Sequence, residues 1–204
     1  MLVRGLVITF TVMLRRGAVR LGGVLGLLAV DEQQLRIDLA ALLVGREQLH
    51  RAIETFERVL GERPLGWNCR SWPSQHTREL LIEEGGFLYD SDGSADDLPY
   101  YARAGGVPFL VVPYSKTYND SRYLMNPGFA SPRDFLETLT MGIDELARDD
   151  RPSMMTVAVH ARWSGQAARA AAMRAFLEHA ATVEGVRFMR RIDIARWWLA
   201  TYPQ

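Results

Sequence analysis

The apolar residues of this chain follow two spacings, one typical of helices and one typical of buried strands. Leu49, Ile53, Phe56 and Leu60 recur every three or four residues ahead of Gly61. This spacing predicts an amphipathic helix, beginning after residue 31, whose apolar face belongs to the core. The same reasoning predicts further helices at residues 73–84, 131–143, 167–181 and 192–199.

Two of these helices have clear start signals, and the first also has a stop signal. Pro73-Ser74 supplies a start, and Gly85-Gly86 permits a left-handed backbone that ends the helix. Ser131-Pro132 followed by Asp134 has the order of a capped helix start. We therefore expect both helices to begin, and the first to end, close to these residues.

Short continuous apolar runs rich in β-branched or aromatic residues separate the helices. They predict strands at residues 65–67, 87–89, 109–112, 154–159 and 186–189. Fully apolar strands that alternate with amphipathic helices are typical of a parallel sheet covered on both faces. The sequence therefore predicts an α/β fold, with the sheet either open or curled into a barrel.

The first thirty residues do not fit this pattern. They are apolar, but Arg15, Arg16 and Arg20 divide them into runs shorter than a membrane span. A signal peptide is poorly formed, because the charges fall in the middle and no clear cleavage site follows. We expect residues 1–30 to be an atypical segment, non-native or disordered, ahead of one domain at 31–204.

Composition and charge narrow the classes of function. The chain has 24 Lys and Arg against 24 Asp and Glu in 204 residues, so no basic field is available to hold a nucleic acid. Its length and apolar content suit a single core. The only cysteine, Cys69, excludes an internal disulfide and suits a reducing compartment. We expect a cytoplasmic protein without nucleic acid or membrane partners, and Cys69 as a buried structural thiol rather than a nucleophile.

Polar side chains follow four of the predicted strands. Arg70, Asp90, Tyr114 and His160 each come shortly after an apolar run. In parallel α/β folds the chemistry gathers where the strands end at their carboxyl side. This pattern predicts an active site at that edge of the sheet.

His160 is the residue on which this prediction depends most. A histidine directly after a buried strand can be a structural group. It can also act as a general acid if a neighbouring carboxylate fixes its tautomer. We favour the general acid, with Asp90 or Asp92 as the orienting carboxylate. The other three histidines fall on predicted helices, and none has the spacing of a helical metal site.

Four aspartates, Asp90, Asp92, Asp96 and Asp97, lie close together in the chain. Such carboxylates repel one another unless cations, donors or water hold them. One interpretation is a turn-rich loop in which they serve backbone geometry. A calcium loop is disfavoured, because its twelfth position is Tyr101 where a bidentate Glu is required. The sharper interpretation is a strand-end carboxylate that orients a catalytic partner.

Four segments of the sequence together resemble a known family. They are GERPLGW, LLIEEGGFLYDSD followed by ADDLPYY, VAVHARWSGQAAR and RRIDIARWW. Over about residues 47–198 they resemble the polysaccharide deacetylase superfamily, and within it the allantoinase-like branch. The resemblance implies a distorted, incomplete (β/α) barrel. It also implies hydrolysis of carbon-nitrogen bonds outside peptides, in N-acetylated amino sugars or in the cyclic amide of allantoin.

The resemblance also implies roles for single residues. Arg70 matches the arginine that orients the catalytic carboxylate, and Asp90 and Asp92 match the motif that positions the acid. His160 matches the histidine that protonates the leaving nitrogen. Ser94 stands where sugar deacetylases tend to place tryptophan, which favours a small amide substrate. The candidates for substrate binding are Trp67, Asp97, Tyr100, Tyr114 and Trp163.

The first two motifs of the family are absent ahead of Glu47. They are an Asp-Asp pair and a His-x-x-x-His pair, and in metal-dependent members they include the base and the ligands of zinc or another divalent metal. We therefore interpret the chain as the C-terminal part of such an enzyme. We assign no metal ligand and leave the cofactor open.

Two functions are compatible with these observations. The preferred one is an amide hydrolase, a homo-oligomer like its relatives, acting on a small-molecule amide or amino sugar. The alternative is a truncated, catalytically inactive homologue whose aromatic side chains bind a small ligand or a partner. A weaker third idea, a secreted enzyme acting on cell-wall glycan, depends on the apolar N-terminus.

Overall fold

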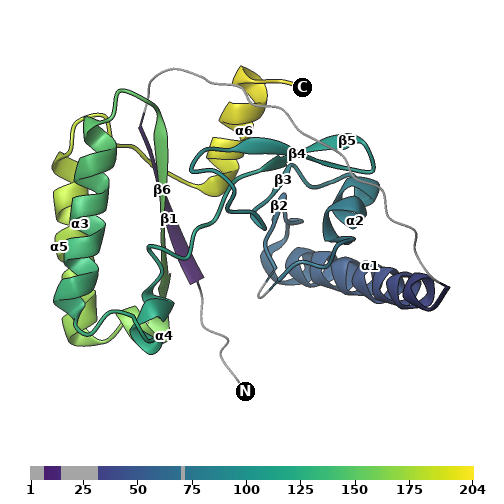
Figure 1. Ribbon diagram of the computed structural model, residues 1–204, viewed down its shortest axis with the longest axis horizontal. Helices are drawn as coiled ribbons and strands as arrows, with labels where there is room; N and C mark the ends of the chain where they lie inside the picture. The colour runs from purple at the N-terminus through teal and green to yellow at the C-terminus, as the bar shows by residue number, and fades with distance from the viewer. Residues whose placement is uncertain (1–6, 15–31, 70–71) are drawn as a thin grey trace. The chain divides into compact units, whose positions relative to one another are not determined.

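The computed structural model describes residues 7–14, 32–69 and 72–204, with side chains from residue 43 onward. Helices and strands alternate along these residues, which confirms the predicted α/β class (Figure 1). The chain divides into two compact units. One comprises Met1–Val19 and Tyr114–Ile194, and the other comprises Arg20–Pro113 and Ala195–Gln204.

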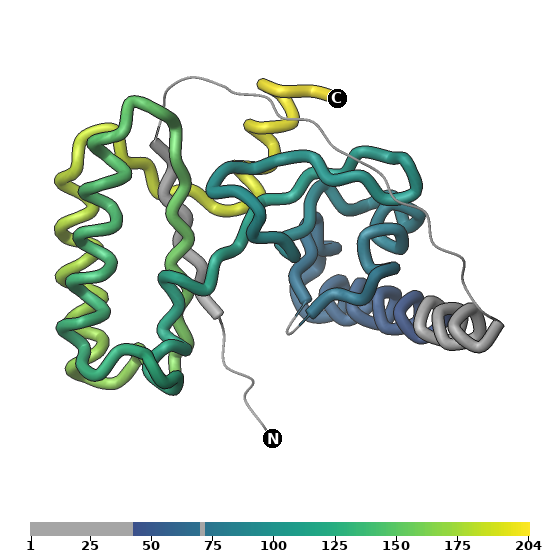
Figure 2. The backbone as a smooth tube through the Cα atoms, in the orientation of Figure 1, coloured from purple at the N-terminus to yellow at the C-terminus, as the bar shows by residue number. Residues whose placement is uncertain are grey.

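The first unit is built on a three-stranded sheet of order β6-β1-β7, in which β1 runs antiparallel to both neighbours. Helices α3 and α5 lie side by side along one face of it (Figure 2). The elements are β1 (Val7–Leu14), η1 (Asp120–Leu124), α3 (Pro132–Arg148), β6 (Ser153–His160), α4 (Ala161–Ser164), α5 (Ala167–Thr182) and β7 (Phe188–Met189).

Helix α3 supplies much of the core of this unit. Phe135, Leu139 and Ile143 are fully buried against β6 and α5, as their spacing predicts. The predicted start is confirmed, because Ser131 caps the helix and Asp134 returns the bond in a capping box. The sequence thus fixes both the start of α3 and the face that it buries.

The second unit is built on a four-stranded sheet of order β2-β3-β5-β4. Strands β2, β3 and β5 are parallel, and β4 pairs antiparallel with β5. The elements are α1 (Glu32–Leu60), β2 (Gly66–Trp67), α2 (Thr77–Glu84), β3 (Tyr89–Asp90), β4 (Tyr100–Ala104), β5 (Val107–Val111) and α6 (Arg191–Thr201), which begins in the first unit.

Helix α1 packs on α2 through Gly45, where a Cβ atom would meet the Leu80 side chain at 2.9 Å. Leu49 and Ile53 are buried there, as predicted. Phe56 and Leu60, predicted as core, are 45% and 63% exposed. The reason is length, since α1 has 29 residues and α2 only eight. The apolar stripe of α1 therefore continues beyond the helix that covers it.

Helix α2 begins later than its sequence suggested and ends where predicted. The N–H of Ser74 donates to Thr77 Oγ1 and the N–H of Thr77 donates to the carbonyl of Ser74, so residues 74–77 form a turn ahead of the helix. At the other end, Gly85 has φ +80° and donates to the carbonyl of Leu81. The predicted left-handed stop is confirmed.

The wholly parallel sheet was a wrong prediction, because two strands went unrecognised. Strand β4 was interpreted as a loop after the aspartates, yet Gly105 and Gly106, with φ of +56° and +81°, turn it back onto β5 as a hairpin. Strand β1 lies in the segment expected to be atypical. The predicted strand at 87–89 begins only at Tyr89. In the part of the chain described, no helix is long and apolar enough to cross a membrane.

Candidate functional site

His160 ends β6 and is held by one buried carboxylate. Its Nδ1 lies 2.6 Å from Asp120 Oδ1, and its backbone N–H donates to Asp120 Oδ2 at 2.7 Å. Ser164 Oγ donates to the same Oδ2 at 2.6 Å. The Asp120 side chain is fully buried, whereas that of His160 is 20% exposed. The carboxylate thus gathers three donors and leaves the imidazole accessible at one side.

Local structure brings Asp120 to this place. The chain before η1 runs alongside the end of β6, because the N–H of Ala158 donates to the carbonyl of Tyr118 and Asn119 bridges to Ala158 in parallel. Asn119 then caps η1 by accepting from the N–H of Ser121 at 2.7 Å. The first residue of η1, Asp120, therefore lies beside the last residue of β6.

This geometry assigns the tautomer of His160. Asp120 accepts from a backbone N–H and from a hydroxyl, so it acts as an acceptor, and Nδ1 is the ring nitrogen that carries the hydrogen. Nε2 is then the nitrogen left for a substrate. A histidine fixed in this way can give or take a proton at Nε2.

Two aromatic residues predicted to bind substrate lie in the same unit. The ring of Trp163 is 4.2 Å from that of His160, with an angle of 46° between them, and Arg162 stacks on its indole. Tyr114 is bonded to Asn119, whose Nδ2 donates to the tyrosine hydroxyl. Burial raises the pKa of Tyr114, so this hydroxyl remains a neutral donor. Trp163 thus contacts the imidazole directly. Tyr114 contacts Asn119, the residue before Asp120 in the chain.

A second cluster lies in the other unit, around Asp90. Its buried carboxylate accepts two bonds from Arg78, at 2.6 Å from Nε and 3.1 Å from Nη2. The N–H of Asp92 adds a third bond at 3.0 Å. Bidentate pairs of this kind fix both partners, and the carboxylate holds the pKa of Arg78 above its ordinary range.

Asp92 is bonded on one oxygen only. Its Oδ1 accepts from the N–H of Cys69 at 2.7 Å and from Asn68 at 3.2 Å, whereas its buried Oδ2 has no hydrogen-bond partner within the described residues. Burial raises the pKa of Asp92. Burial, and then the neighbouring Asp92, raise the pKa of Cys69 to about 11, so the thiol is a poor nucleophile. Trp67 donates to the Cys69 sulfur at 3.3 Å.

The remaining predicted residues are placed as follows. Tyr100 lies in β4 with its hydroxyl over Gly93, where a Cβ atom would be only 2.2 Å away. Asp97 is exposed in the loop before β4. Arg70 lies outside the described residues. Within the described residues, Arg78 is the arginine that orients Asp90. The resemblance had implied this role for Arg70.

The sequence analysis missed Asp120, Ser164 and Arg78. Asp90 or Asp92 was predicted to orient His160, but Asp120 fills that position. The sequence signal for Asp120 is the polar Tyr118-Asn119-Asp120 run that follows a buried strand. This run holds one carboxylate, whereas the cluster at residues 90–97 holds four. The two clusters lie in different units, so their convergence in one cavity stays a prediction.

The described residues do not fit the divalent metal that the resemblance implies. No three His, Cys, Asp or Glu side chains among them could hold an ion together. Asp90 and Asp120 instead accept from protein donors through both oxygens, and Asp92 does so through Oδ1 only. We therefore derive no chemistry through a metal from these residues.

Comparison with known proteins finds that the chain is similar to part of several longer proteins. No family model matches it. A curated Schizosaccharomyces pombe protein with the name "Putative polysaccharide deacetylase" is 32% identical over 178 residues, covering 77% of this chain and 55% of its own length.

Solved structures agree with this match. An allantoinase is 42% identical with a TM-score of 0.71, covering 86% of this chain and 56% of the allantoinase. A polysaccharide deacetylase from Pseudomonas aeruginosa PAO1 is 40% identical with a TM-score of 0.72, covering 78% of this chain and 54% of that protein. The chain spans about half the length of the relatives that it matches.

Proposed function

Because this chain belongs to the polysaccharide deacetylase superfamily and spans part of its fold, we propose that it hydrolyses carbon-nitrogen bonds outside peptides. The proposed substrate is a small linear or cyclic amide. Relatives named allantoinase and polysaccharide deacetylase support this class. Ser94, where a tryptophan would suit a sugar, favours the smaller substrate.

The observation that carries the proposal is the His160–Asp120 pair. Hydrolysis of an amide needs a proton on the departing nitrogen, since an amide anion is a poor leaving group. With the Nδ1 hydrogen held by Asp120 at 2.6 Å, the ring takes up a second proton at Nε2, and this is the proton that it delivers to the departing nitrogen. Trp163 packs against the imidazole with its ring tilted by 46°, on the same unit as the Asp120 carboxylate that holds Nδ1.

The Asp90–Arg78 pair has a separate role in this proposal. A carboxylate fixed by a bidentate arginine and by the N–H of Asp92 is a rigid acceptor. We assign it to positioning, because its oxygens are occupied by protein donors. Arg70, Trp67, Asp97 and Tyr100 stay predictions as its neighbours in the site.

The test measures release of allantoate from allantoin, and of acetate from N-acetylated chitooligosaccharides, with and without added zinc. His160→Ala is expected to lower kcat by about 10²–10⁴. The matched control is His179→Ala, since His179 also pairs with a carboxylate, Asp144 at 2.6 Å, but lies on α5. Equal rates for His160→Ala and the parent would contradict the role of His160.

A second candidate is an inactive homologue that binds a small ligand. It is favoured by the lack of a group of three metal-ligating side chains among the described residues. It predicts that allantoin quenches the fluorescence of Trp163 without being hydrolysed. Turnover above background in the assay above would remove this candidate.

A further inference from the structure

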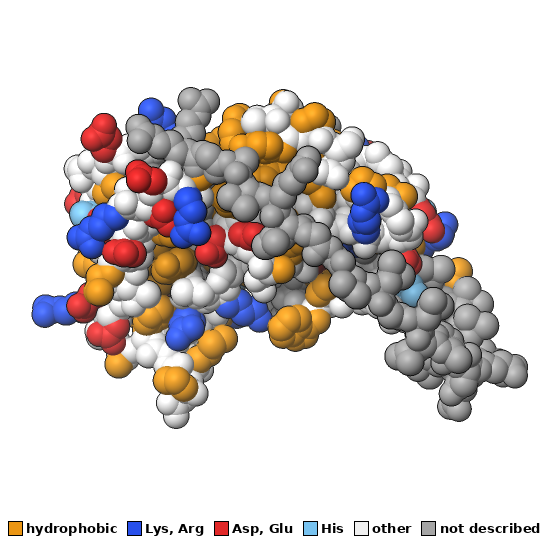
Figure 3. Space-filling view, turned by 45° about the horizontal axis from the view of Figure 1, so that its top comes forward, with side chains coloured by type: hydrophobic (Ala, Val, Ile, Leu, Met, Phe, Trp, Pro, Cys, Tyr) orange, Lys and Arg blue, Asp and Glu red, His pale blue; other side chains and the backbone are white. Residues whose placement is uncertain are grey.

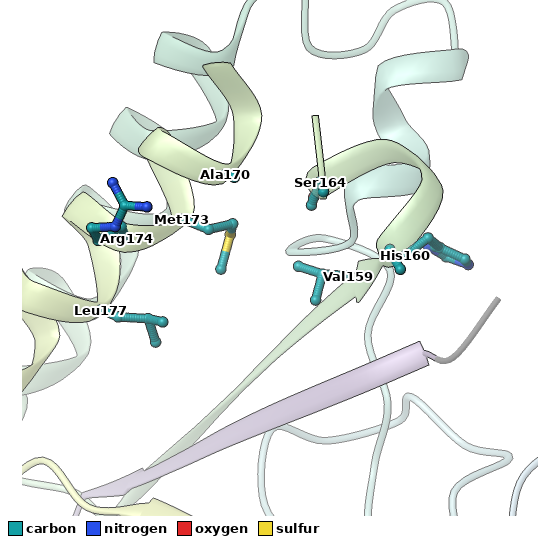
Figure 4. A pocket seen from close by; sticks show the side chains of 9 residues that line it. Val159, His160, Ser164, Ala170, Met173, Arg174 and Leu177 are labelled. Atoms are coloured by element: carbon teal, nitrogen blue, oxygen red, sulfur yellow. The ribbon is translucent and has the colours of Figure 1, made fainter. Parts of the chain in front are cut away.

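A cavity of about 380 Å³ lies between the end of β6, α4 and the first half of α5. Val159, Met173 and Leu177 face into it, whereas the imidazole of His160 projects away from it (Figure 4). His160 borders the cavity, and its ring, which carries Nε2, points away from the other lining side chains. Its volume falls within the range of about 300–1,000 Å³ that is usual for small-molecule sites.

The lining of this cavity combines two kinds of side chain. The wall is aliphatic, formed by Val159, Ala170, Met173 and Leu177. Arg174 also lines the cavity, is exposed, and has no hydrogen-bond or ion-pair partner in the part of the chain that the structure describes. An apolar pocket with one cation in its lining is complementary to a ligand with an aliphatic tail and an anionic head.

We propose that this cavity binds a small aliphatic monocarboxylate. The tail lies against Val159, Met173 and Leu177, and the carboxylate pairs with Arg174. Carboxylate is favoured because a guanidinium binds its two oxygens with parallel N–H bonds. The site goes beyond the proposed hydrolysis and does not depend on it.

The cavity also contacts the residues that hold His160. Ser164 lines it and donates to Asp120 Oδ2 at 2.6 Å. An occupant therefore touches α4 directly behind the Asp120–His160 pair. Binding is expected to be felt at His160 as a change in position of α4, without contact to the imidazole.

Octanoate is the probe, and 1-octanol is its uncharged counterpart. Titration calorimetry on the whole chain should show saturable binding of octanoate. Arg174→Gln should weaken octanoate about tenfold, the usual loss for one charge-assisted bond, and leave 1-octanol unchanged. Arg133→Gln is the matched control, because Arg133 is exposed on α3, away from the cavity.

A cavity-filling variant tests the position of the tail. Ala170→Leu keeps the helical preference of α5 and should abolish binding of both probes. The methyl NMR signal of Met173, assigned with Met173→Leu, should shift on titration with octanoate and remain still in Ala170→Leu. Absence of saturable binding, or octanoate affinity unchanged in both Arg174→Gln and Ala170→Leu, would overturn the proposal.

Discussion

Asp120 shows how one buried side chain decides the chemistry of its neighbours. It accepts from the N–H and Nδ1 of His160 and from the hydroxyl of Ser164, and it is fully buried. Removing an acceptor from such a network leaves a donor buried without a partner, which costs more than the bond itself contributed.

Asp120→Asn should therefore lower catalysis without removing the imidazole. The amide can turn its NH₂ toward Nδ1, which favours the opposite tautomer, with its hydrogen on Nε2, and it removes the negative charge that stabilises the doubly protonated ring. We expect kcat to fall about 10²–10⁴ with a smaller change in KM, measured on the substrate identified by the assay above. Asp144→Asn, which alters the His179 pair, is the control and should retain the parent rate.

Cys69 gives a prediction that needs no substrate. Its pKa of about 11, against an ordinary 9.0, reduces the thiolate at pH 8 about hundredfold. Alkylation by iodoacetamide at pH 8 should be slower by that factor than in the urea-unfolded chain. Because the folded pKa is raised, the contribution of the buried thiol to stability is present below pH 9 and is lost as the pH rises towards 11. Equal alkylation rates in the two states would show an exposed thiolate.

At the residue scale the sequence predicts the environment of a side chain better than it predicts the hydrogen-bond partners of that side chain. His160 at the end of a buried strand and Cys69 as an unreactive thiol agree with their environments. The carboxylate partner of His160 was assigned wrongly, since Asp120 lies 40 residues before the histidine, and Arg78, which lies on a helix, was not predicted as a partner of Asp90. Hydrogen bonds between distant residues leave no periodic trace in a sequence.

Among the elements, α3 has the best-defined end. The Ser131 hydroxyl accepts from the N–H of Asp134 at 3.3 Å, and Asp134 accepts from the N–H of Ser131 at 2.9 Å. Both bonds satisfy backbone donors that no helix can satisfy by itself. This cap depends only on residues that are close together in the sequence, which is why it was predicted correctly.

Ser131→Ala should lower the free energy of unfolding by about 1 kcal/mol, the usual cost of a lost N-cap. Urea unfolding followed by circular dichroism measures it. The control is Ser153→Ala, because the buried Ser153 hydroxyl has no partner in the described part of the chain. Its removal should be neutral or stabilising. A larger loss for Ser153→Ala than for Ser131→Ala would contradict this ranking.

Strands were predicted less well than helices. Strand β6 was correct within a residue at each end, because it is continuously apolar and buried. Strand β4 contains Tyr100, Arg103 and little periodicity, and its pairing depends on the Gly105-Gly106 turn. Short edge strands are defined by their neighbours in space, so local patterns identify them poorly.

For the whole molecule, the balance of acidic and basic charge is the most direct constraint on which partners the chain binds. Acidic and basic side chains are interspersed on the face shown in Figure 3. With 24 charges of each sign, the chain should show no measurable binding to a labelled DNA duplex by fluorescence anisotropy at about 50 mM salt. Binding that weakens steeply with added salt would contradict this expectation.

The α/β class and the family were predictable from the whole chain, because alternating elements and four separated motifs are both encoded along its length. The mixed strand directions were not. They follow from β1 and the β4 hairpin, whose partners are chosen in three dimensions. Convergence of His160 with the aspartates, the partner predictions and the cytoplasmic location stay predictions.

The pairing of β1 with β6 has a consequence for synthesis on the ribosome. Val7 lies opposite His160 and Leu14 opposite Ser153, so β1 pairs with a strand that lies far later in the chain. Strand β1 lacks its partner β6 while about 140 residues are translated, which at about 5–20 residues per second takes on the order of ten seconds. During that interval its free edge is open to chaperones or to neighbouring nascent chains. Production of this protein should therefore respond to translation speed and temperature more than production of a protein whose strands pair in order.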